Sequence, residues 1–295
     1  MNEAIRGIIT KKDDGSEQVN YNNDNFPAYL HAGWVEPWVT WVNMPHFHED
    51  LEFITITHGK MGYNINGEKV YLEEGDTLMV NSNQLHFSFT TTDDRCTYYI
   101  CILHPSLLCS SYVVQNEAVE PITKNTNLKY IHIKNTDNMA KEFFNQSQRL
   151  MDSQEVEFNT TLEFFHMFKL IRYYCRDKKI ITTANIVNTN DINLKNMLKF
   201  IRNNYEKKIT LDDIAKAGNV SKTYCNMLFK QFTGYTPMES LNRYRADRVA
   251  YYVIKTDMSM SEIAEKTGFS GASYMTETFK KIYGVAPRNF VQVKG

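Results

Sequence analysis

Long apolar runs are missing from this 295-residue chain: none reaches the ~18 consecutive residues that a membrane-spanning helix needs. The first 16 residues have no apolar core and carry Lys11, Lys12, Asp13 and Asp14, so we expect no secretory signal. Pro (7 residues) and Gly (13 residues) are sparse, while hydrophobic residues make up 42% and charged residues 23%. These proportions exclude fibrous and low-complexity chains and predict a globular protein, and the length favours two domains.

Cysteine is also scarce, and the motifs of common enzyme classes are absent. The five Cys are an odd number and include no Cys-x-x-Cys pair, which favours free thiols in a reducing cytoplasm. The sequence contains no Gly-rich phosphate loop and no Gly-x-Ser-x-Gly nucleophile motif. We therefore predict that the chain is not an enzyme.

Charge is distributed unevenly along the chain. Residues 1–190 carry 16 Lys and Arg against 24 Asp and Glu, a formal charge of −8. Residues 191–295 carry 17 Lys and Arg against 10 Asp and Glu, a formal charge of +7. The whole chain is therefore close to neutral. An acidic first part and a basic last third indicate two tasks, and the basic part favours a polyanion such as nucleic acid, although a solvated helical face can carry the same charge.

Short strands are predicted between Trp34 and Leu103. The pair Asn66-Gly67 separates two strand-like runs and favours a tight hairpin, because both turn residues must accept a positive φ. A further turn is predicted at residues 74–76. The predicted strands are residues 51–57, 61–65, 68–72, 77–80, 85–89 and 95–103. Regularly spaced short strands of this kind are typical of an antiparallel barrel or sandwich.

Two helices are predicted after the strands, over residues 138–151 and 155–176. The second is apolar almost all the way round, with Phe158, Leu162 and Phe165 on one side and further apolar residues on the others. A helix that is apolar on several faces must be covered on several sides. One side can pack on its own barrel, and the other can form a homodimer interface or be buried within the same subunit.

A linker is predicted over residues 178–190, which are rich in Thr and Asn and have little helical periodicity. The predicted domains are thus residues 1–177 and residues 191–295. The expected fold class is a two-domain α+β chain, in which an antiparallel β-barrel with helices precedes an all-α domain.

The last hundred residues contain an internal repeat. Ile214-Ala215 recurs as Ile263-Ala264, 49 residues later. Each copy begins with a capping-box pattern, Thr210-x-x-Asp213 or Ser259-x-x-Glu262, and continues as a short helix, a turn and a second helix expected to open at Ser221 or Ser270. Five later positions recur 50 residues on: Tyr224, Phe229, Lys230, Gly234 and Pro237 as Tyr274, Phe279, Lys280, Gly284 and Pro287.

This pattern predicts a helix-turn-helix in duplicate, joined by a long helix over residues 237–255. A helix-turn-helix places its second helix in the DNA major groove, and two units held one helical turn apart, ~34 Å, can enter successive grooves.

Residues 192–290 resemble the DNA-binding domain of the AraC/XylS family of bacterial transcription regulators. The most specific part is Gly268-Phe269-Ser270 with Phe279-Lys280-Lys281, and Arg245 and Ala250 match the connecting-helix pattern. The resemblance implies that the first half of each recognition helix faces bases: Lys222, Thr223, Asn226 and Met227 in one copy, and Ala272, Ser273, Thr276 and Glu277 in the other.

The chemistry of these side chains agrees with base reading at some of the positions and not at others. Asn226 can bond adenine twice, Lys222 can reach guanine and Glu277 can accept from cytosine, whereas Met227 and Ala272 offer only apolar contact. For each of these residues, the alternative to base reading is contact with a DNA phosphate, or exposure to solvent without any DNA contact. We expect Lys230, Lys280 and Lys281 to bind phosphate. Core positions are expected at Ile214, Ala215, Leu228, Phe229, Ile263, Ala264, Tyr274 and Phe279.

The acidic part resembles the cupin-like sensor that many such regulators carry, over about residues 25–105. His46, His48, Glu52 and His86 match the positions that bind metal in metallo-cupins, and three imidazoles with one carboxylate suit a divalent transition metal. The usual Pro and Gly before the last His are Asn81 and Asn83 here. The four residues can therefore bind metal, bond an organic effector, or satisfy one another.

Aromatic residues crowd the same region: Trp34, Trp38, Trp41, Phe47, Tyr63 and Phe87. Flat aromatic faces beside polar groups can hold a sugar ring, and Trp38 and Trp41 are the better candidates for effector contact. Most of the others are expected in the barrel core.

The resemblance implies a sequence-specific transcription regulator, more often an activator, that responds to a small molecule. Its expected partners are promoter DNA, the effector, RNA polymerase and a second copy of the chain. The alternatives are a metal-dependent cupin enzyme fused to a DNA-binding domain, and a DNA-repair protein with a reactive Cys. The DNA-repair alternative is disfavoured because a reactive Cys needs an electropositive setting, and Cys96, Cys101 and Cys109 fall in the acidic sensor part.

Overall fold

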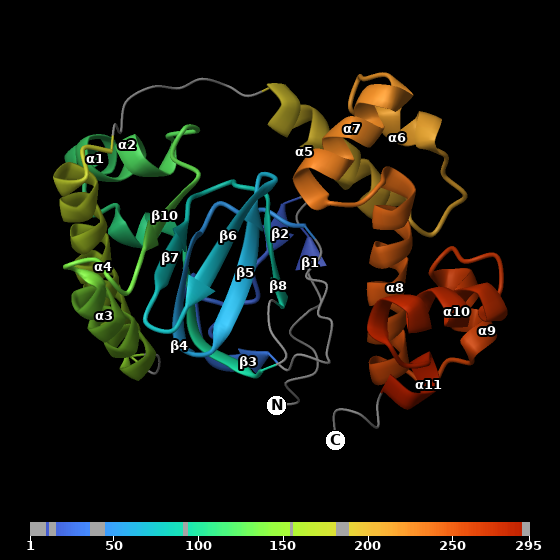
Figure 1. The fold of residues 1–295 in the computed structure, drawn as a ribbon, viewed down its shortest axis with the longest axis horizontal. Helices are drawn as coiled ribbons and strands as arrows, with labels where there is room; N and C mark the ends of the chain where they lie inside the picture. The colour runs from blue at the N-terminus through green and yellow to red at the C-terminus, as the bar shows by residue number, and fades with distance from the viewer. Residues whose placement is uncertain are drawn as a thin grey trace.

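A computed structural model describes residues 10–11, 16–35, 45–90, 94–153, 156–180 and 189–290 of the chain. A β-rich N-terminal domain with two long helices and several short ones lies beside a wholly helical C-terminal domain (Figure 1). No helix in these ranges is both long and apolar enough to cross a membrane. This arrangement confirms the predicted α+β fold class.

The N-terminal strands form antiparallel sheets of two, five and three strands among the described residues. The five-stranded sheet has the order β10-β7-β4-β9-β3 and the three-stranded sheet the order β6-β5-β8. The strands are β1 (Thr10–Lys11), β2 (Glu17–Gln18), β3 (Ala28–Val35), β4 (Leu51–His58), β5 (Lys60–Ile65), β6 (Glu68–Glu73), β7 (Thr77–Val80), β8 (His86–Thr90), β9 (Cys96–Leu103) and β10 (Tyr130–Ile133). Each of the six predicted strand ranges coincides with one of these strands to within about a residue at either end.

Strand β4 shows how the sheet separates two cores. Leu51 and Phe53 point to a core shared with the helices, whereas Ile54 and Ile56 point to a core between the five- and three-stranded sheets. Successive side chains of a strand alternate between its faces, so Glu52 shares a face with Ile54. The carboxylate therefore lies between the two sheets.

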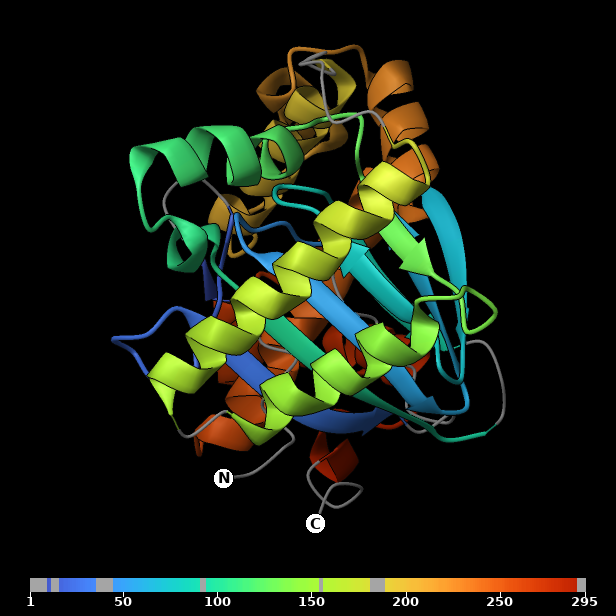
Figure 2. The same ribbon diagram turned by 90° about the vertical axis from the view of Figure 1, so that its left-hand side faces the viewer.

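Two antiparallel helices, α3 (Ala140–Asp152) and α4 (Glu157–Asp177), lie across the outer face of the five-stranded sheet (Figure 2). Phe164, Met167 and Ile171 of α4 are fully buried against this sheet, and Phe143 and Leu150 of α3 share the same core. Shorter helical segments precede them: η2 (Pro105–Leu108), α1 (Tyr112–Val114), η3 (Gln115–Val119) and α2 (Glu120–Thr123). The helices therefore cover one face of the sheet and leave its other face toward the three-stranded sheet.

The C-terminal domain contains two helix-turn-helix units that share one long helix. The first unit pairs α6 (Leu211–Ala217) with α7 (Lys222–Thr233), and the second pairs α9 (Met260–Lys266) with α10 (Ala272–Tyr283). The other helices are α5 (Thr189–Asn204), α8 (Pro237–Lys255) and α11 (Pro287–Phe290). Both predicted capping boxes are present, at Thr210 and Ser259.

The turns of the two units place different residue types in the same left-handed backbone position. Asn219 (φ 52°) holds the left-handed position after α6, and Gly268 (φ 75°) holds the equivalent position after α9. The backbone amide that follows each returns to the helix, from Val220 to Ala215 and from Phe269 to Ala264. The expected opening of α10 at Ser270 is wrong, because the extra residue Gly271 takes the N-cap position and makes no side-chain bond.

Helix α8 joins the two units rigidly. Its Leu241 and Tyr244 enter the core of the first unit, while Ala246 and Val249 enter that of the second. With 19 residues, it is ~28 Å long, close to the spacing of successive major grooves. Of the predicted linker, residues 181–188 lie outside the described residues.

Candidate functional site

Four side chains of the N-terminal domain converge between the sheets. His46 and His48 lie in the segment before β4, Glu52 is the second residue of β4, and His86 is the first of β8. One donor atom from each lies within 4.8 Å of all the others. The sequence predicted this set, and the fold brings all four residues together.

The backbone holds the imidazoles in place. His46 and His86 pair in an antiparallel bridge, with N–O distances of 3.1 and 2.9 Å. His48 Nδ1 donates to the Asp50 carbonyl oxygen (3.1 Å) and His86 Nδ1 to that of Gln84 (2.8 Å). These bonds leave the Nε2 atoms directed at Glu52 Oε2, 3.5 Å from His48 and 3.3 Å from His86.

Glu52 is the electrostatic centre of the site. Burial alone would raise the pKa of its carboxyl, but His86 and His48 hold that pKa well below its usual value. Burial alone would lower the pKa of His48, yet its hydrogen bond to Glu52 and the nearby carboxylates raise it overall. Tyr63 of β5 also donates to Glu52 Oε1 (3.0 Å). The carboxylate is therefore ionised and fixed in one orientation.

Glu17 of β2 is a neighbour that the sequence analysis did not include. Its Oε2 lies 3.3 Å from His46 Nε2, and its backbone amide donates to the Phe47 carbonyl oxygen (2.8 Å). Burial raises the pKa of Glu17 to about 7, although His48 and His86 act to lower it. No local pattern marks this residue, because it lies in a two-residue strand far from the histidine motif.

The donor set fits a divalent transition-metal ion. A tetrahedral ion with ~2.1 Å bonds holds its donors ~3.4 Å apart, comparable with the spacing seen here. In addition, His48 Nε2 and His86 Nε2 face the same carboxylate oxygen, Glu52 Oε2, at 3.5 and 3.3 Å. Imidazole nitrogens and a carboxylate oxygen directed at one point are ligands that suit such an ion.

The two asparagines that depart from the cupin pattern are accommodated. Asn83 adopts φ 62°, the conformation that glycine usually supplies, and its amide donates to the His48 carbonyl oxygen (2.7 Å). Asn81 Nδ2 donates to the carbonyl oxygens of Ile122 and Leu128, both at 2.8 Å. The turn before His86 is therefore built without the usual Pro and Gly.

The aromatic residues of this region are dispersed. Trp38 and Trp41 lie outside the described residues, while Trp34 is 48% exposed on β3. Phe47 and Phe87 are buried. Tyr63 contacts the cluster of three histidines and Glu52 by donating its hydroxyl to Glu52.

The recognition helix of the first unit, α7, presents its predicted DNA-facing residues outward. Lys222, Thr223, Met227 and Lys230 are exposed, and Asn226 is half-buried with its amide bonded to the Lys222 carbonyl oxygen (3.0 Å). Lys222 Nζ also lies 3.2 Å from Asp212. The opposite face of α7 supplies Leu228 and Phe229 to the core.

Helix α10 is arranged in the same way. Ser273, Glu277, Lys280 and Lys281 are exposed, while Ala272 and Thr276 are half-buried. Of the eight positions expected in the core, seven are buried or partly covered as predicted, but Tyr274 is 47% exposed. Its hydroxyl accepts from Asn242 Nδ2 (3.2 Å), so that prediction is wrong and Tyr274 is a surface residue.

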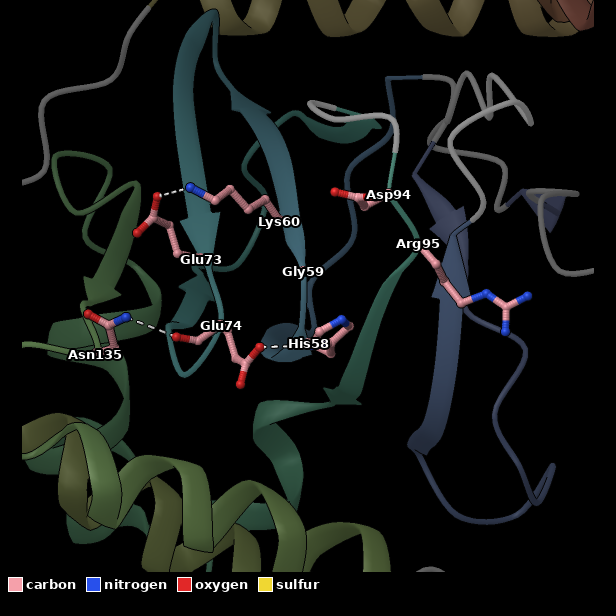
Figure 3. A pocket seen from close by; sticks show the side chains of 8 residues that line it. All are labelled: His58, Gly59, Lys60, Glu73, Glu74, Asp94, Arg95 and Asn135. Carbon is pink, nitrogen blue, oxygen red and sulfur yellow. Dashed lines mark hydrogen bonds and ion pairs between the residues drawn. The ribbon is translucent and has the colours of Figure 1, made fainter.

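A surface pocket of about 450 Å³ lies elsewhere on the N-terminal domain (Figure 3). Its charged groups pair with one another, His58 with Glu74 (3.0 Å) and Lys60 with Glu73 (2.6 Å). None of the predicted site residues lines it. The pocket therefore does not compete with the histidine cluster as the candidate ligand site.

Comparison with known families agrees with both sites. Residues 40–113 match the AraC-like ligand binding domain, and residues 214–292 match a helix-turn-helix domain. The chain belongs to the AraC family of transcription regulators. The matched ligand-binding segment includes all four cluster residues, and the matched helix-turn-helix segment includes both recognition helices.

Relatives of this AraC-family chain are transcription regulators, and the similarity covers most of the length of each. The HTH-type regulator YdeC of Bacillus subtilis is 26% identical over 250 residues, covering 83% of this chain and 84% of YdeC. The activator RhaS of an Enterobacter species is 22% identical over 284 residues, which cover 93% of this chain and 97% of RhaS. Apo ToxT from Vibrio cholerae has the same fold, with a TM-score of 0.50 and 11% identity. The match covers 93% of this chain and 100% of the ToxT chain.

Proposed function

We propose that this AraC-family regulator activates transcription from promoters that its two helix-turn-helix units read in successive major grooves. The observation that carries the proposal is the pair of exposed recognition helices joined by one rigid helix, α8. The relation to the activator RhaS supports activation over repression. RNA polymerase is the expected partner, and the cytoplasm, where promoter DNA is accessible, is the expected location.

We assign base reading to the first half of each recognition helix and phosphate binding to the lysines that follow. Exposure of these faces supports the assignment. The base-reading residues are Lys222, Thr223, Asn226 and Met227 in α7, and Ala272, Ser273, Thr276 and Glu277 in α10. The phosphate-binding residues are Lys230, Lys280 and Lys281.

Asn226→Ala tests this assignment on the full-length chain. We expect a loss of about 1–3 kcal/mol on the preferred sequence, with relaxed choice at one base pair, because a bidentate contact to adenine disappears. Lys280→Ala is the control and weakens binding to all sequences alike. Titrations of labelled duplexes at several salt concentrations measure both effects. Equal losses on preferred and random DNA after Asn226→Ala would remove its base-reading role.

The N-terminal domain binds the signal, and we propose that His46, His48, Glu52 and His86 hold a divalent transition-metal ion there. The close spacing of three imidazole nitrogens and one carboxylate oxygen, all within 4.8 Å of one another, supports an ion. The ion would supply a positive charge to three imidazoles and one carboxylate. We further propose a sensory role for the ion instead of an enzymatic one, since the relatives are transcription regulators.

A homodimer is proposed to form through the outer face of α4. Phe158 is 71% exposed and Leu162 43% exposed on this face, which Figure 2 shows in front of the sheet. Exposed apolar residues on one helix stripe favour a helix–helix interface between two copies. The domain boundary proposed within residues 178–190 leaves this interface entirely in the ligand-binding domain.

Phe158→Glu is therefore expected to convert a dimer into a folded monomer, because it places a charge in the interface without touching the core. Tyr112→Glu, at a residue 81% exposed elsewhere on the domain, is the matched control and should leave the dimer intact. Sedimentation at micromolar concentration, with and without DNA, measures the mass. A wild-type chain that stays monomeric under both conditions contradicts the proposal.

A further inference from the structure

The metal-ligand segments also contribute to the core of the DNA-binding domain. Phe47 lies between His46 and His48 in sequence, and Leu85 directly precedes His86. Both side chains are buried in the same hydrophobic cluster as Leu194 and Leu198 of α5. This cluster also includes the core of the first helix-turn-helix unit. A shift of either ligand segment therefore moves a side chain that the first unit packs against.

Polar contacts from α5 reach the backbone of the same two segments. Lys195 Nζ donates to the Asn83 carbonyl oxygen (2.6 Å) and lies 4.7 Å from the centre of the Phe47 ring. The buried guanidinium of Arg202 donates to the Pro45 carbonyl oxygen and is close enough to Glu17 for their charges to interact. Glu17 in turn contacts His46. These contacts place α5 against Pro45 and Phe47, which are adjacent to ligand residues in sequence, and against Asn83, three residues before His86.

The hairpin between β5 and β6 makes a third contact, seen beside α7 in Figure 1. A Cβ atom at Gly67 would lie 2.4 Å from the Gln231 carbonyl oxygen at the end of α7. The hairpin turn is tied to the site as well, because Leu85 N donates to Asn66 Oδ1 (2.9 Å). The exposed base-reading residues, Lys222 to Met227, lie at the other end of α7 and are not part of this contact.

From these contacts we propose that metal binding and docking of the first helix-turn-helix unit onto the ligand-binding domain are thermodynamically linked. The inference rests on the proposed metal site. An ion draws His46, His48 and His86 into one fixed arrangement, and that arrangement holds Phe47, Leu85 and the Pro45 and Asn83 carbonyls where α5 meets them. Docking in turn holds the ligand segments in place before the ion arrives.

Linkage of this kind is reciprocal. If the ion favours the docked arrangement, the docked arrangement binds the ion more tightly by the same factor. An ion bound equally well by docked and undocked chains would shift nothing. Metal occupancy then sets how rigidly the first recognition helix is held relative to the ligand-binding domain, and in a dimer it sets the placement of the two DNA-binding domains.

Removing a docking contact that does not touch the ligand set tests the linkage. Lys195→Met removes the bond to Asn83 while keeping apolar length over Phe47, and Lys195→Ala removes both. Lys208→Ala, an exposed residue of the same domain, is the control for loss of one positive charge. Zn²⁺ affinity of each full-length chain is measured by competition with a chelator of known affinity. We expect a five-fold or greater loss for Lys195→Ala, a smaller loss for Lys195→Met, and none for Lys208→Ala.

Hydrogen exchange on the same proteins supplies a readout that is independent of affinity. In the wild type, Zn²⁺ should slow exchange in α5 and at the Asn66-Gly67 turn, and in Lys195→Ala this effect should shrink. Equal Zn²⁺ affinities for all chains, with α5 exchange unaffected by the ion, would overturn the linkage while leaving the metal site intact. Failure of the wild type to bind Zn²⁺ would overturn both the metal site and the linkage.

Discussion

The His86→Ala chain is expected to hold essentially no Zn²⁺ after dialysis, whereas the wild type holds close to one ion per chain. The variant removes one of four donors from a buried site. It also deprives Glu52 of the imidazole 3.3 Å away. Loss of a residue that merely supports a ligand costs ~10–100-fold in metal affinity, and loss of the ligand itself should cost more.

His48→Ala should behave in the same way, because His48 is another of the four donors and its Nε2 faces Glu52 Oε2 at 3.5 Å. The matched control is His58→Ala, since His58 is an exposed histidine paired with Glu74 outside the cluster. Elemental analysis of the purified chains measures the content of Zn, Fe, Mn, Co, Ni and Cu. Retention of one ion per chain in both cluster variants would show that the ion is held elsewhere. Metal-free wild type with a response to an organic inducer lost in both variants would favour an organic effector.

The second large effect is expected at the turn of the second helix-turn-helix unit. Gly268 has φ 75°, and a Cβ atom there would lie 2.2 Å from the Tyr205 carbonyl oxygen and 2.9 Å from that of Glu206. Arg245 of α8 already donates to the carbonyl oxygens of Tyr205 (2.8 Å) and Lys207 (2.8 Å), so this backbone is held in place. Gly268→Ala must therefore displace one backbone segment or the other.

We expect Gly268→Ala to destabilise the second unit by about 3 kcal/mol or more, from the left-handed strain and the backbone overlap together. Asn219→Ala is the matched control, because Asn219 occupies the equivalent left-handed position of the first unit, and it should cost about 1 kcal/mol. Hydrogen exchange of α10 in Gly268→Ala, compared with that of α7 in Asn219→Ala, measures the two costs. Equal, small effects in both variants would contradict the close approach of Gly268 to Tyr205.

Local sequence patterns were sufficient to predict the parts of the structure that depend on local rules. The Asn66-Gly67 turn, the capping boxes at Thr210 and Ser259, and the repeat of Ile214-Ala215 each follow from backbone preferences within a few residues. Family resemblance was sufficient to predict His46, His48, Glu52 and His86 as one cluster, because their spacing places them on segments that pair in this fold.

Longer-range features had no local pattern to reveal them. Glu17 reaches His46 only because the first strands fold back beside the loop before β4, and nothing around Glu17 indicates this. The role of Phe47 and Leu85 in the core of the other domain depends on how the domains dock. Tyr274 holds the same third position of its helix as Tyr224, yet it lies at the surface, because its exposure depends on which parts of the other helices pack beside α10.

Selection of binding sites from a pool of random duplex DNA by the purified full-length chain tests the central claim most directly. We expect enrichment of one sequence pattern with two conserved segments about one helical turn, ~10 base pairs, apart, as two recognition helices joined by α8 require. Asn226→Ala should relax one position in one segment only. Recovery of unenriched, random sequence by the wild type, with and without Zn²⁺, would contradict sequence-specific regulation by this chain.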